Sequence, residues 1–589
     1  MKQILFAASA ILLFTTCGNN GSVNNNAASN AALGKLFANY WEDNLKLNPF
    51  LATSAGDNRF NDQFPNDQTA AHRAKELAMY NKYLEALKPF EKASLNATDR
   101  ESVDLLKYEL QLHVDEAKFP FHELPINQFW SFALEFPQLG SGSGNQPFKS
   151  VKDYENWVAR MKQFPVWMDS CIGNMRAGIA HGNVLPKVLV EKMIPQAKSM
   201  LSIDPTKSIF YEPIKNMPKD FADSSKKKLQ NVYFYNISNA VLPAYARLRS
   251  FLEQEYLPAA RATHGLSSLP QGTAMYNHLI KTYTTVTLDA DSIHRLGLQQ
   301  VAYLRSEMEK VKQEVKFTGT LAEFFEFMNT DKQFYIFNTP QQVLDSFWSV
   351  NKTIAPYLSK MFKNTPKTKF EIRQTEAFRQ ATASAEYNNG SEDGTRPGIF
   401  YVPIIDAKKF NPIGMETLFL HEAIPGHHYQ ISLQQENKGL PQFRKFLGYS
   451  AYAEGWALYT ETLGKELGVY KNPYQYFGHL SDAMHRAIRL VVDAGIHTKN
   501  MSREEAIAYM RNNERISEQE ATAEIERYMA IPGQALSYTI GKLSILKMRE
   551  KYQTQLGAKF SLAEFHEQLL NGGNMPLSLL EAKLKRAFE

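Results

Sequence analysis

The sequence is poor in cysteine. Only two of its 589 residues are cysteines, and one of them, Cys17, lies in an N-terminal segment that we do not expect to fold. The other, Cys171, has no partner for an intramolecular disulfide, and no zinc-finger framework of cysteines and histidines can be built around it. The folded body must therefore be held together by packing rather than by cross-links.

The sequence also lacks a large excess of charge of either sign. The 66 lysines and arginines are nearly balanced by 61 aspartates and glutamates, which leaves a net charge of +5, and no block of like charge stands out. Neither a nucleic acid nor an acidic partner is therefore predicted. The sequence has no internal repeat, and it does not indicate an oligomeric state.

Residues 4–14 form an apolar run that is too short to span a bilayer. With Lys2 before it and Thr15-Thr16-Cys17 after it, the run has the proportions of a secretory signal, and the segment resembles the lipobox of bacterial lipoproteins. We therefore expect residues 1–16 to be a signal peptide. Cys17 is expected to carry the lipid that anchors an exported lipoprotein to a membrane of the cell envelope. An ordinary signal peptide cut nearby is the alternative.

The residues that follow are expected to form a flexible tether, 17–33. Between 18 and 30 nearly every residue is Gly, Asn, Ser or Ala, and such a composition cannot bury enough apolar surface to fold. The folded body is therefore predicted to begin at about residue 34.

Most of the remaining chain has the apolar period of helices, so the fold class is predicted to be mainly α. Apolar residues between 36 and 41 predict a helix that ends near Asn48-Pro49, and those between 293 and 315 predict a long amphipathic helix. Thr98, followed three residues later by Glu101, predicts a capping box.

Two segments depart from the helical pattern. Residues 119–148 are rich in Pro, Gly, Ser and aromatics, and they form either a substrate-facing loop or surface packing. Residues 398–402 follow a turn signal and predict a short strand just before the motif described next.

The most informative stretch is His421-Glu422-Ala423-Ile424-Pro425-Gly426-His427-His428. A histidine followed at once by a glutamate, with further histidines close behind, is how hydrolases assemble a zinc site and its general base. In the usual form the second histidine is four residues on, about 6 Å along a helix. Here it is six or seven residues on, about 9 or 10.5 Å of rise in a straight helix, too far for two ligands of one ion.

Pro425 and Gly426 make a break in that helix plausible. Proline has no N–H to give to the carbonyl of His421, and glycine adopts backbone angles closed to other residues. A two-residue bulge at this point could bring His427 back beside His421. We therefore rank His427 first as the second ligand and keep His428 as its competitor.

A second predicted helix, residues 452–461, supplies carboxylates. Two helices joined by a short loop are expected to be antiparallel neighbours, so Glu454 can face the histidines and is predicted to be the third ligand. It lies in an apolar and aromatic stretch, where an unpaired charge is costly unless a metal or cation satisfies it. Glu461, two turns on, could accept a hydrogen bond from a ligand histidine.

Two further polar groups are candidates. His485, Arg489, Asp493 and His497 recur every four residues along one helical stripe, either as a solvated face or as a wall of the cleft in which Asp493 or His497 orients a ligand or contacts substrate. In the C-terminal run, three residues could support an oxyanion or hold a carboxylate or carbonyl. They are Arg527, Tyr528 and Tyr538.

These motifs resemble those of the bacterial family long labelled "domain of unknown function 885". Its members share the patterns that stand here at residues 421–428, 452–459, 489–497 and 527–538, and the segment 393–398 also fits. The resemblance runs from about residue 34 to near the C-terminus.

That family looks like a distant relative of the gluzincin peptidases, such as carboxypeptidase Taq, thimet oligopeptidase and angiotensin-converting enzyme. The resemblance implies a helical, two-lobed architecture with a deep channel and a small β edge near the site, divided into an N-terminal lobe (34–370) and a catalytic lobe (371–589). It implies His421, His427 and Glu454 as zinc ligands and Glu422 as the base.

The resulting hypothesis is a zinc-dependent metallopeptidase that hydrolyses short peptides with metal-activated water. Glu422 would take the proton of the water, and Tyr538 with Arg527 or Tyr528 would support the oxyanion. Two alternatives stay open. One is a lipid-anchored binding or scaffold protein with a structural or vestigial metal site, and the other is a metal hydrolase that acts on a non-peptide amide or ester.

Overall fold

The computed structural model describes residues 28–376, 380, 383–392, 394 and 396–589. The predicted signal peptide, residues 1–16, and the anchor residue Cys17 lie outside the described residues. Within them the protein is mainly α-helical, as predicted, with one small sheet. In this described part of the chain, every helix is too short or too polar to serve as a membrane span.

The first helix, α1 (Ala31–Leu47), begins inside the segment predicted to be tether. Asn30 caps the helix by accepting a hydrogen bond from the backbone N–H of Leu33, and Leu33 is fully buried. The prediction that the tether extends to residue 33 is therefore wrong, because Ala31 and Ala32 continue the polar tract in composition but are strong helix formers. The predicted end of this helix near Asn48 is confirmed.

Helices account for most of the chain up to residue 361. After α1 they are α2 (Pro49–Ser54), α3 (Ala70–Glu91), α4 (Ala97–Glu116), α5 (Phe132–Gly140), α6 (Val151–His181), α7 (Lys187–Ser199), α8 (Glu212–Lys215), α9 (Asp223–Asn236), α10 (Leu242–Phe251), α11 (Leu257–Ala259), α12 (Gly272–Thr284), α13 (Ala290–Glu314), α14 (Leu321–Thr330) and α15 (Pro340–Met361). The long amphipathic helix predicted over 293–315 is confirmed as α13. The capping box predicted at Thr98 is wrong, because Asn96 caps α4 by accepting from the N–H of Asp99.

A three-stranded sheet follows, and then helices again. The strands are β1 (Phe370–Gln374), β2 (Glu386–Asn388) and β3 (Gly398–Val402), and the helices are α16 (Met415–Glu422), α17 (His427–Glu436), α18 (Gln442–Phe446), α19 (Ser450–Thr462), α20 (Pro473–Thr498), α21 (Arg503–Asn513), α22 (Glu518–Ala530), α23 (Ser537–Leu556), α24 (Leu562–Leu570) and α25 (Leu577–Phe588).

The sheet has the order β1-β3-β2. β1 is parallel to β3, with Phe370 opposite Gly398, and β2 is antiparallel to it, with Tyr387 opposite Phe400. The central strand β3 is the one predicted over 398–402. It is buried because α15 packs on it, with the rings of Phe347 and Phe400 5.2 Å apart.

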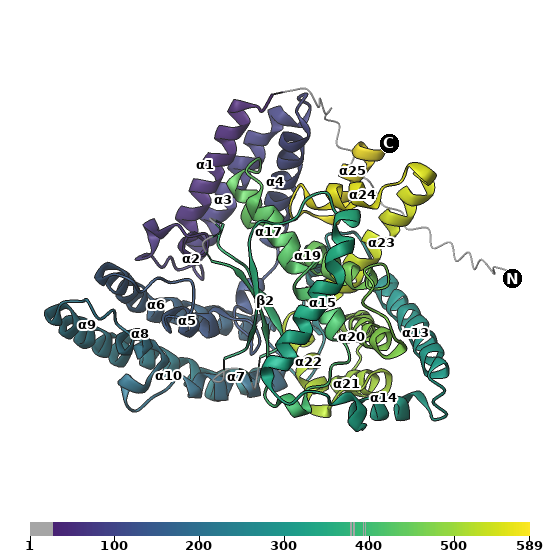
Figure 1. The fold of residues 1–589 in the computed structure, drawn as a ribbon. Helices are drawn as coiled ribbons and strands as arrows, with labels where there is room; N and C mark the ends of the chain where they lie inside the picture. Colours follow the sequence, from purple (N-terminus) through teal and green to yellow (C-terminus); the bar gives the residue numbers. More distant parts are fainter. Residues whose placement is uncertain (1–27, 377–379, 381–382, 393, 395) are drawn as a thin grey trace.

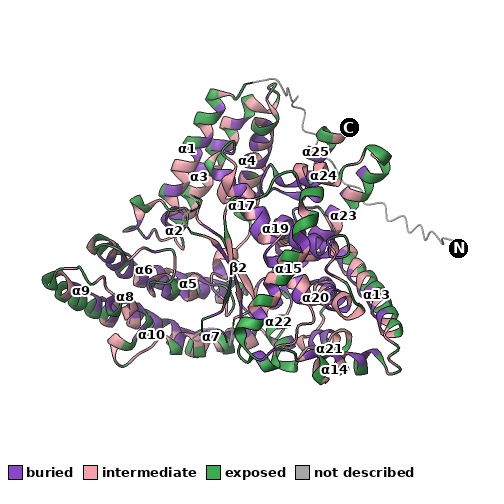
Figure 2. Ribbon diagram, viewed as in Figure 1, coloured by how far each residue is buried: buried purple, intermediate pink, exposed green. Residues whose placement is uncertain are grey.

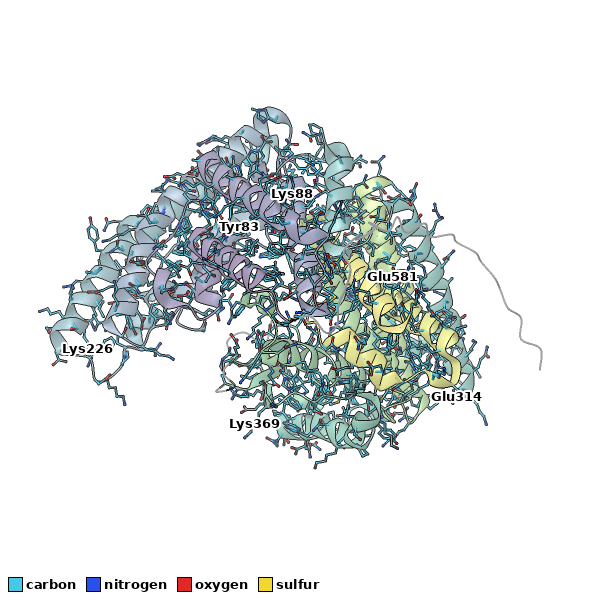
Figure 3. All side chains as sticks on the ribbon, turned by 90° about the horizontal axis from the view of Figure 1, so that it is seen from above. Tyr83, Lys88, Lys226, Glu314, Lys369 and Glu581 are labelled. Carbon is cyan, nitrogen blue, oxygen red and sulfur yellow. The ribbon has the colours of Figure 1, made fainter. Side chains whose placement is uncertain are left out.

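The described residues form more than one hydrophobic core, and these cores do not correspond to consecutive halves of the sequence. Helices α5 to α10 form an arm that projects from the rest of the molecule (Figure 1), and residues between 126 and 256 build most of a separate core for it. Seen from above, Lys226 marks the outer end of this arm (Figure 3). The first helix instead packs on the C-terminal half, where Trp41 stacks on Phe446. The predicted division at residue 370 and the deep channel stay predictions.

The segment 119–148 contains a helix that was not predicted, α5, and an exposed loop before it. The side-chain amide of Asn127 donates to the carbonyl of Ala530, and that of Gln128 donates to the carbonyl of Glu526. The loop therefore ties the arm to α22. The helix was missed because Pro137 and two glycines near its end hide its apolar period.

Candidate metal centre

The helix is interrupted between α16 and α17, within the histidine-rich motif. The Ile424–Pro425 peptide bond in this break is cis. The turn passes so close to the preceding helix that a Cβ atom on Gly426 would lie 1.9 Å from the carbonyl oxygen of His421, so only glycine fits here. The predicted break therefore exists, and it places the imidazole rings of His421 and His427 4.8 Å apart between centroids.

Helix α19 runs antiparallel to the broken pair, as predicted, and supports the break. The indole N–H of Trp456 donates to the carbonyl of Pro425 at 2.8 Å. The hydroxyl of Thr460 donates to the carbonyl of Leu420 at 2.8 Å. Two carbonyls that the interrupted helix leaves without intrahelical partners are thus satisfied by side chains of α19. Most of α19 is buried (Figure 2).

The triad formed by His421, His427 and Glu454 is a candidate metal site. The Oε2 atom of Glu454 lies 3.5 Å from Nε2 of His421 and 3.6 Å from Nε2 of His427, and all three ligand atoms lie within 4.8 Å of one another. Burial alone would raise the pKa of the Glu454 carboxyl, but the two histidines outweigh it and hold the pKa well below its usual range. Glu454 is therefore ionised, as a metal ligand must be.

The triad is buried unevenly. The side chain of His421 is 6% exposed, whereas those of His427 and Glu454 are 14% and 22% exposed. Solvent therefore reaches the cluster from the side of His427 and Glu454.

Glu461 fixes the orientation of His421. Its Oε1 atom lies 2.8 Å from Nδ1 of that imidazole, which leaves Nε2 turned toward Glu454. Burial raises the pKa of the Glu461 carboxyl, but hydrogen bonds from His421 and His479 outweigh it and lower the pKa to about 2. An ionised Glu461 accepts the Nδ1 proton and so makes Nε2 the free, basic nitrogen.

Glu422 lies next to the triad at the C-terminal end of α16, and its side chain is almost completely buried. Burial raises the pKa of this carboxyl, against the opposing effect of the neighbouring His421 and His427. A carboxylate with a raised pKa binds a proton more readily than an exposed one, which is the property required of a general base.

His428, kept as the competitor of His427, points away from the triad. Its Nδ1 atom lies 2.8 Å from the hydroxyl of Tyr387 on β2, and its ring packs against Phe370 on β1. Burial lowers the pKa of His428 to about 4. His428 therefore joins α17 to the sheet, and its candidacy as a ligand is wrong because it is not among the described residues whose ligand atoms converge.

Asp493 and His497 form hydrogen bonds within the protein core, and they do not orient a ligand of the triad as predicted. Asp493 accepts from the hydroxyl of Tyr276 at 2.5 Å and from the N–H of Gly533 at 3.1 Å. Nδ1 of His497 accepts from the N–H of Leu266 at 3.1 Å, and Nε2 donates to a backbone carbonyl. Both side chains are fully buried, so neither a solvated face nor contact with substrate describes them.

Tyr528 is also a correction. Its ring is fully buried, and its hydroxyl donates to Glu524 at 2.5 Å while it accepts from Arg489 at 2.9 Å. This hydroxyl cannot stabilise an oxyanion in this arrangement, because its only proton is donated to Glu524.

Arg527 and Tyr538 differ in the hydrogen bonds that their side chains form. Arg527 donates to Gln534 at 3.0 Å and to Glu524 at 3.4 Å. The half-buried ring of Tyr538 lies under the guanidinium of Arg489, 4.7 Å from it, and its hydroxyl has no hydrogen bond to any described residue. Tyr538 thus keeps a free donor, and the catalytic roles of both residues stay predictions.

Sequence reasoning missed two residues at the site. His479 on α20 lies 3.7 Å from the second oxygen of Glu461, and its ring stacks on Tyr470. Arg486, also on α20, slightly opposes the burial that raises the pKa of Glu422, and its charge contributes to the lowered pKa of Glu461. Arg486 stands one helical turn before Arg489, and this spacing was the available signal because both can face the same neighbouring helices.

The fold and the site define a mainly α protein with a candidate metal centre held between two antiparallel helices. The chain belongs to the family described as "Bacterial protein of unknown function (DUF885)", whose model matches residues 49–584. None of the curated proteins matches this sequence.

Solved structures show the same fold. One, from Colwellia psychrerythraea, is 28% identical, covers 94% of this chain and 98% of its own, and has a TM-score of 0.86. Another, from Shewanella oneidensis, is 20% identical, covers 95% of this chain and 100% of its own, and has a TM-score of 0.75. Each is described as a "putative lipoprotein", the second one "of unknown function".

Proposed function

We propose that the protein is a zinc-dependent metallopeptidase that hydrolyses short peptides. The observation that carries the proposal is the combination of three converging ligands with a buried carboxylate, Glu422, directly beside them. For two ligands about 2.1 Å from a tetrahedral zinc ion, the ligand atoms lie about 3.4 Å apart. The distances of 3.5 and 3.6 Å from Glu454 to His421 and His427 agree with that spacing.

The number of ligands supports catalysis over a purely structural site. Structural zinc sites are closed by four protein ligands, whereas catalytic sites use three and keep a position open. His428 would be the fourth ligand here, but the ligand atoms that converge in the described residues are those of His421, His427 and Glu454 alone. Three protein ligands would leave the fourth position of a tetrahedral ion to water or substrate.

A bound zinc ion supplies the Lewis acidity that makes water nucleophilic near pH 7. Glu422 accepts the proton of the attacking water on a carboxylate oxygen as the bond from oxygen to the peptide carbon forms. It then gives that proton to the amine nitrogen as the carbon–nitrogen bond breaks. The free hydroxyl of Tyr538, together with Arg527, remains a candidate to support the oxyanion.

Substitution of Glu422 by glutamine tests this proposal. The change removes the base but leaves all three ligands, so the variant should bind about one zinc ion per chain and lose about 1000-fold in kcat. Zinc is measured by mass spectrometry of the purified protein, and activity by digestion of a peptide library with and without a chelator.

Glu416→Gln is the matched control, because Glu416 is a largely buried carboxylate on the same helix, bound to Gln475 at 2.6 Å. It should retain activity. Wild-type protein that binds no zinc, or a Glu422→Gln variant that is as active as wild type, would contradict the proposal.

We also propose that the protein is an exported lipoprotein anchored through Cys17. This rests on the signal-like segment 1–16 and on the description of the two structural neighbours. Metabolic labelling with a palmitate analogue should mark the wild-type chain and not a Cys17→Ser variant, and equal labelling of both would contradict the anchor.

A further inference from the structure

A cavity of about 820 Å³ lies between the start of α4, the turn after α17 and the C-terminal helices α24 and α25. Cavities of this size accommodate small ligands. Among the described residues that line it, the charged ones are Glu101, Lys583 and Arg586, and none of the lining residues belongs to the triad. The cavity is therefore a separate site, and its own wall must indicate what it binds.

Two cations of α25 belong to this wall. Lys583 and Arg586 are three residues apart, so they share one face of the helix. Lys583 is only 5% exposed, whereas Arg586 is an exposed residue. Within the described part of the chain, no carboxylate lies within 4.0 Å of Arg586 and no group accepts a hydrogen bond from it. Arg586 is thus available to a ligand that enters the cavity.

The carboxylates on this side of α4 are engaged by other groups. Glu101, which lines the cavity, lies 3.3 Å from Arg444 and 4.0 Å from Lys583. Asp104, one turn further along α4, lies 3.7 Å from Arg100. Because Arg444 adds a further cation to the two of the wall, positive charge exceeds negative charge around the cavity. Its ligand is therefore expected to be an anion.

The hydrogen bonds of Lys583 leave donors for such an anion. Its ammonium donates to Oδ1 of Asn571, and Glu101 lies beyond hydrogen-bond distance. An ammonium carries three N–H donors, so two of them have no partner among the described residues. Burial lowers the pKa of Lys583 to about 8, although the charge of Glu101 opposes this shift. The present partners therefore do not make up for the water that the ammonium has lost.

The cavity lies close to the end of the folded body that leads to the proposed anchor. The N–H of Asn30, which caps α1, donates to Oδ2 of Asp99 at 2.8 Å, and Asp99 directly follows Ala97 and Thr98 in the cavity wall. The start of α1 and helix α25 lie at the same end of the molecule (Figure 1). Cys17 precedes Asn30 by 13 residues, which span at most about 45 Å.

We propose that this cavity binds the phosphate group of an anionic phospholipid in the membrane that holds the anchor. The inference rests on the proposed lipid anchor at Cys17. Guanidinium and ammonium groups both donate charge-assisted hydrogen bonds to phosphate, and basic pockets of membrane proteins bind lipid headgroups with them. A headgroup held beside the tether would turn this end of the folded body toward the membrane.

Hydrogen exchange of the lipidated full chain on vesicles tests this inference. One set of vesicles is pure phosphatidylcholine, and the other is an equal mixture with phosphatidylglycerol, whose headgroup is an anionic phosphate diester. We expect backbone exchange in α25 to be at least about fivefold slower on the mixed vesicles, because the bound headgroup contacts two side chains of this helix. Arg586→Gln should abolish most of this difference, and so should Lys583→Met.

Lys585→Gln is the matched control. Lys585 is a cation of the same helix, but its side chain is 68% exposed, lies 3.9 Å from Glu589 and does not line the cavity. This variant should keep the full difference between the vesicles. Equal losses in Lys585→Gln and Arg586→Gln would show a general attraction of charge and overturn the inference. Circular dichroism confirms folding, and Arg586→Gln serves alone if the buried Lys583→Met variant is unfolded.

Calorimetry on the detergent-solubilised chain distinguishes a lipid headgroup from free phosphate. The probes are inorganic phosphate and glycerophosphoglycerol, which is the soluble headgroup of phosphatidylglycerol. We expect glycerophosphoglycerol to bind at least about tenfold more weakly to Arg586→Gln than to the wild type. Tighter binding of inorganic phosphate than of glycerophosphoglycerol, together with equal exchange on both kinds of vesicle, would assign the cavity to free phosphate and overturn the lipid ligand.

Failure of the anchor gives a different result from failure of the cavity. If the palmitate analogue does not label the chain but glycerophosphoglycerol still binds through Arg586, the anchor is contradicted and the cavity still recognises a headgroup. A labelled chain whose α25 exchanges equally on both kinds of vesicle contradicts the cavity assignment alone.

Discussion

Two regions of this protein combine histidine with a carboxylate on buried helices, and they are satisfied in opposite ways. In the region around Asp493 and His497, every contact is made to other protein groups. The carboxylate receives a tyrosine hydroxyl and a backbone N–H, and the imidazole joins a backbone N–H to a backbone carbonyl. In the triad, the Nε2 atoms of His421 and His427 face the oxygen of Glu454 across a gap.

The difference shows that residue type alone does not identify a metal site. Buried polar groups must find partners, and backbone groups provide them at Asp493 and His497. At the triad the break between α16 and α17 brings His427 beside His421, and α19 supplies Glu454, so three ligand atoms lie within 4.8 Å of one another. Partial exposure of His427 and Glu454 then gives an ion a way in.

The largest expected effect separates the two adjacent histidines of the motif. His427→Ala removes a triad ligand and should weaken zinc binding by more than about 100-fold, beyond what the loss of an outer hydrogen-bond partner costs. His428→Ala should leave zinc affinity within about threefold, because His428 contacts Tyr387 rather than the triad. Competition with a chromophoric chelator measures both constants, and a similar loss in the two variants would show that His428 is a ligand.

A smaller effect is expected at the partner of His421. Glu461→Gln keeps the shape of the side chain but removes the ionised acceptor of the Nδ1 proton, which should lower zinc affinity by about 10- to 100-fold. Glu466→Gln is the control, since Glu466 lies just beyond α19 with an exposed side chain and binds Arg549 at 2.7 Å. If both variants keep wild-type affinity, Glu461 does not orient the ligand.

The local part of the site could be predicted from the sequence. The break followed from Pro425 and Gly426, and the antiparallel pairing of α19 with the motif followed from the short connection between them. Both depend on residues close together in the chain, where backbone chemistry and loop length limit the choices. The end of α1 and the extent of α13 were predictable for the same reason, whereas Asn96 and Thr98 are both acceptable caps by type.

The rest depends on contacts between distant parts of the chain. The partner of His428 lies on β2, and the partners of Asp493 come from α12 and from the turn after α22. A four-residue spacing along α20 identifies which residues share a face, but not what that face contacts. Arg486 was missed for the same reason, since its place on α20 does not show which carboxylates of other helices its charge affects.

The smallest expected effect tests the region around Asp493 and His497, where the hydrogen bonds are made to other protein groups. Burial lowers the pKa of His497 to about 3, from an ordinary value of about 6.5. As the pH falls below 6.5, the unfolded chain gains a proton that folded His497 cannot accept, so stability is lost over the range from pH 6.5 toward pH 3. Between pH 6.5 and 5.5 this loss amounts to about 1 kcal/mol.

His497→Gln removes the titrating group. Over this pH interval the free energy of unfolding of the variant should therefore fall by about 1 kcal/mol less than that of the wild type, although the variant is less stable at the start. Urea unfolding of the two metal-free chains at both pH values measures the difference, because all other histidines contribute equally and cancel. An identical decline in both chains would mean that His497 takes up a proton in the folded state, and that the backbone contacts of this region do not hold it neutral.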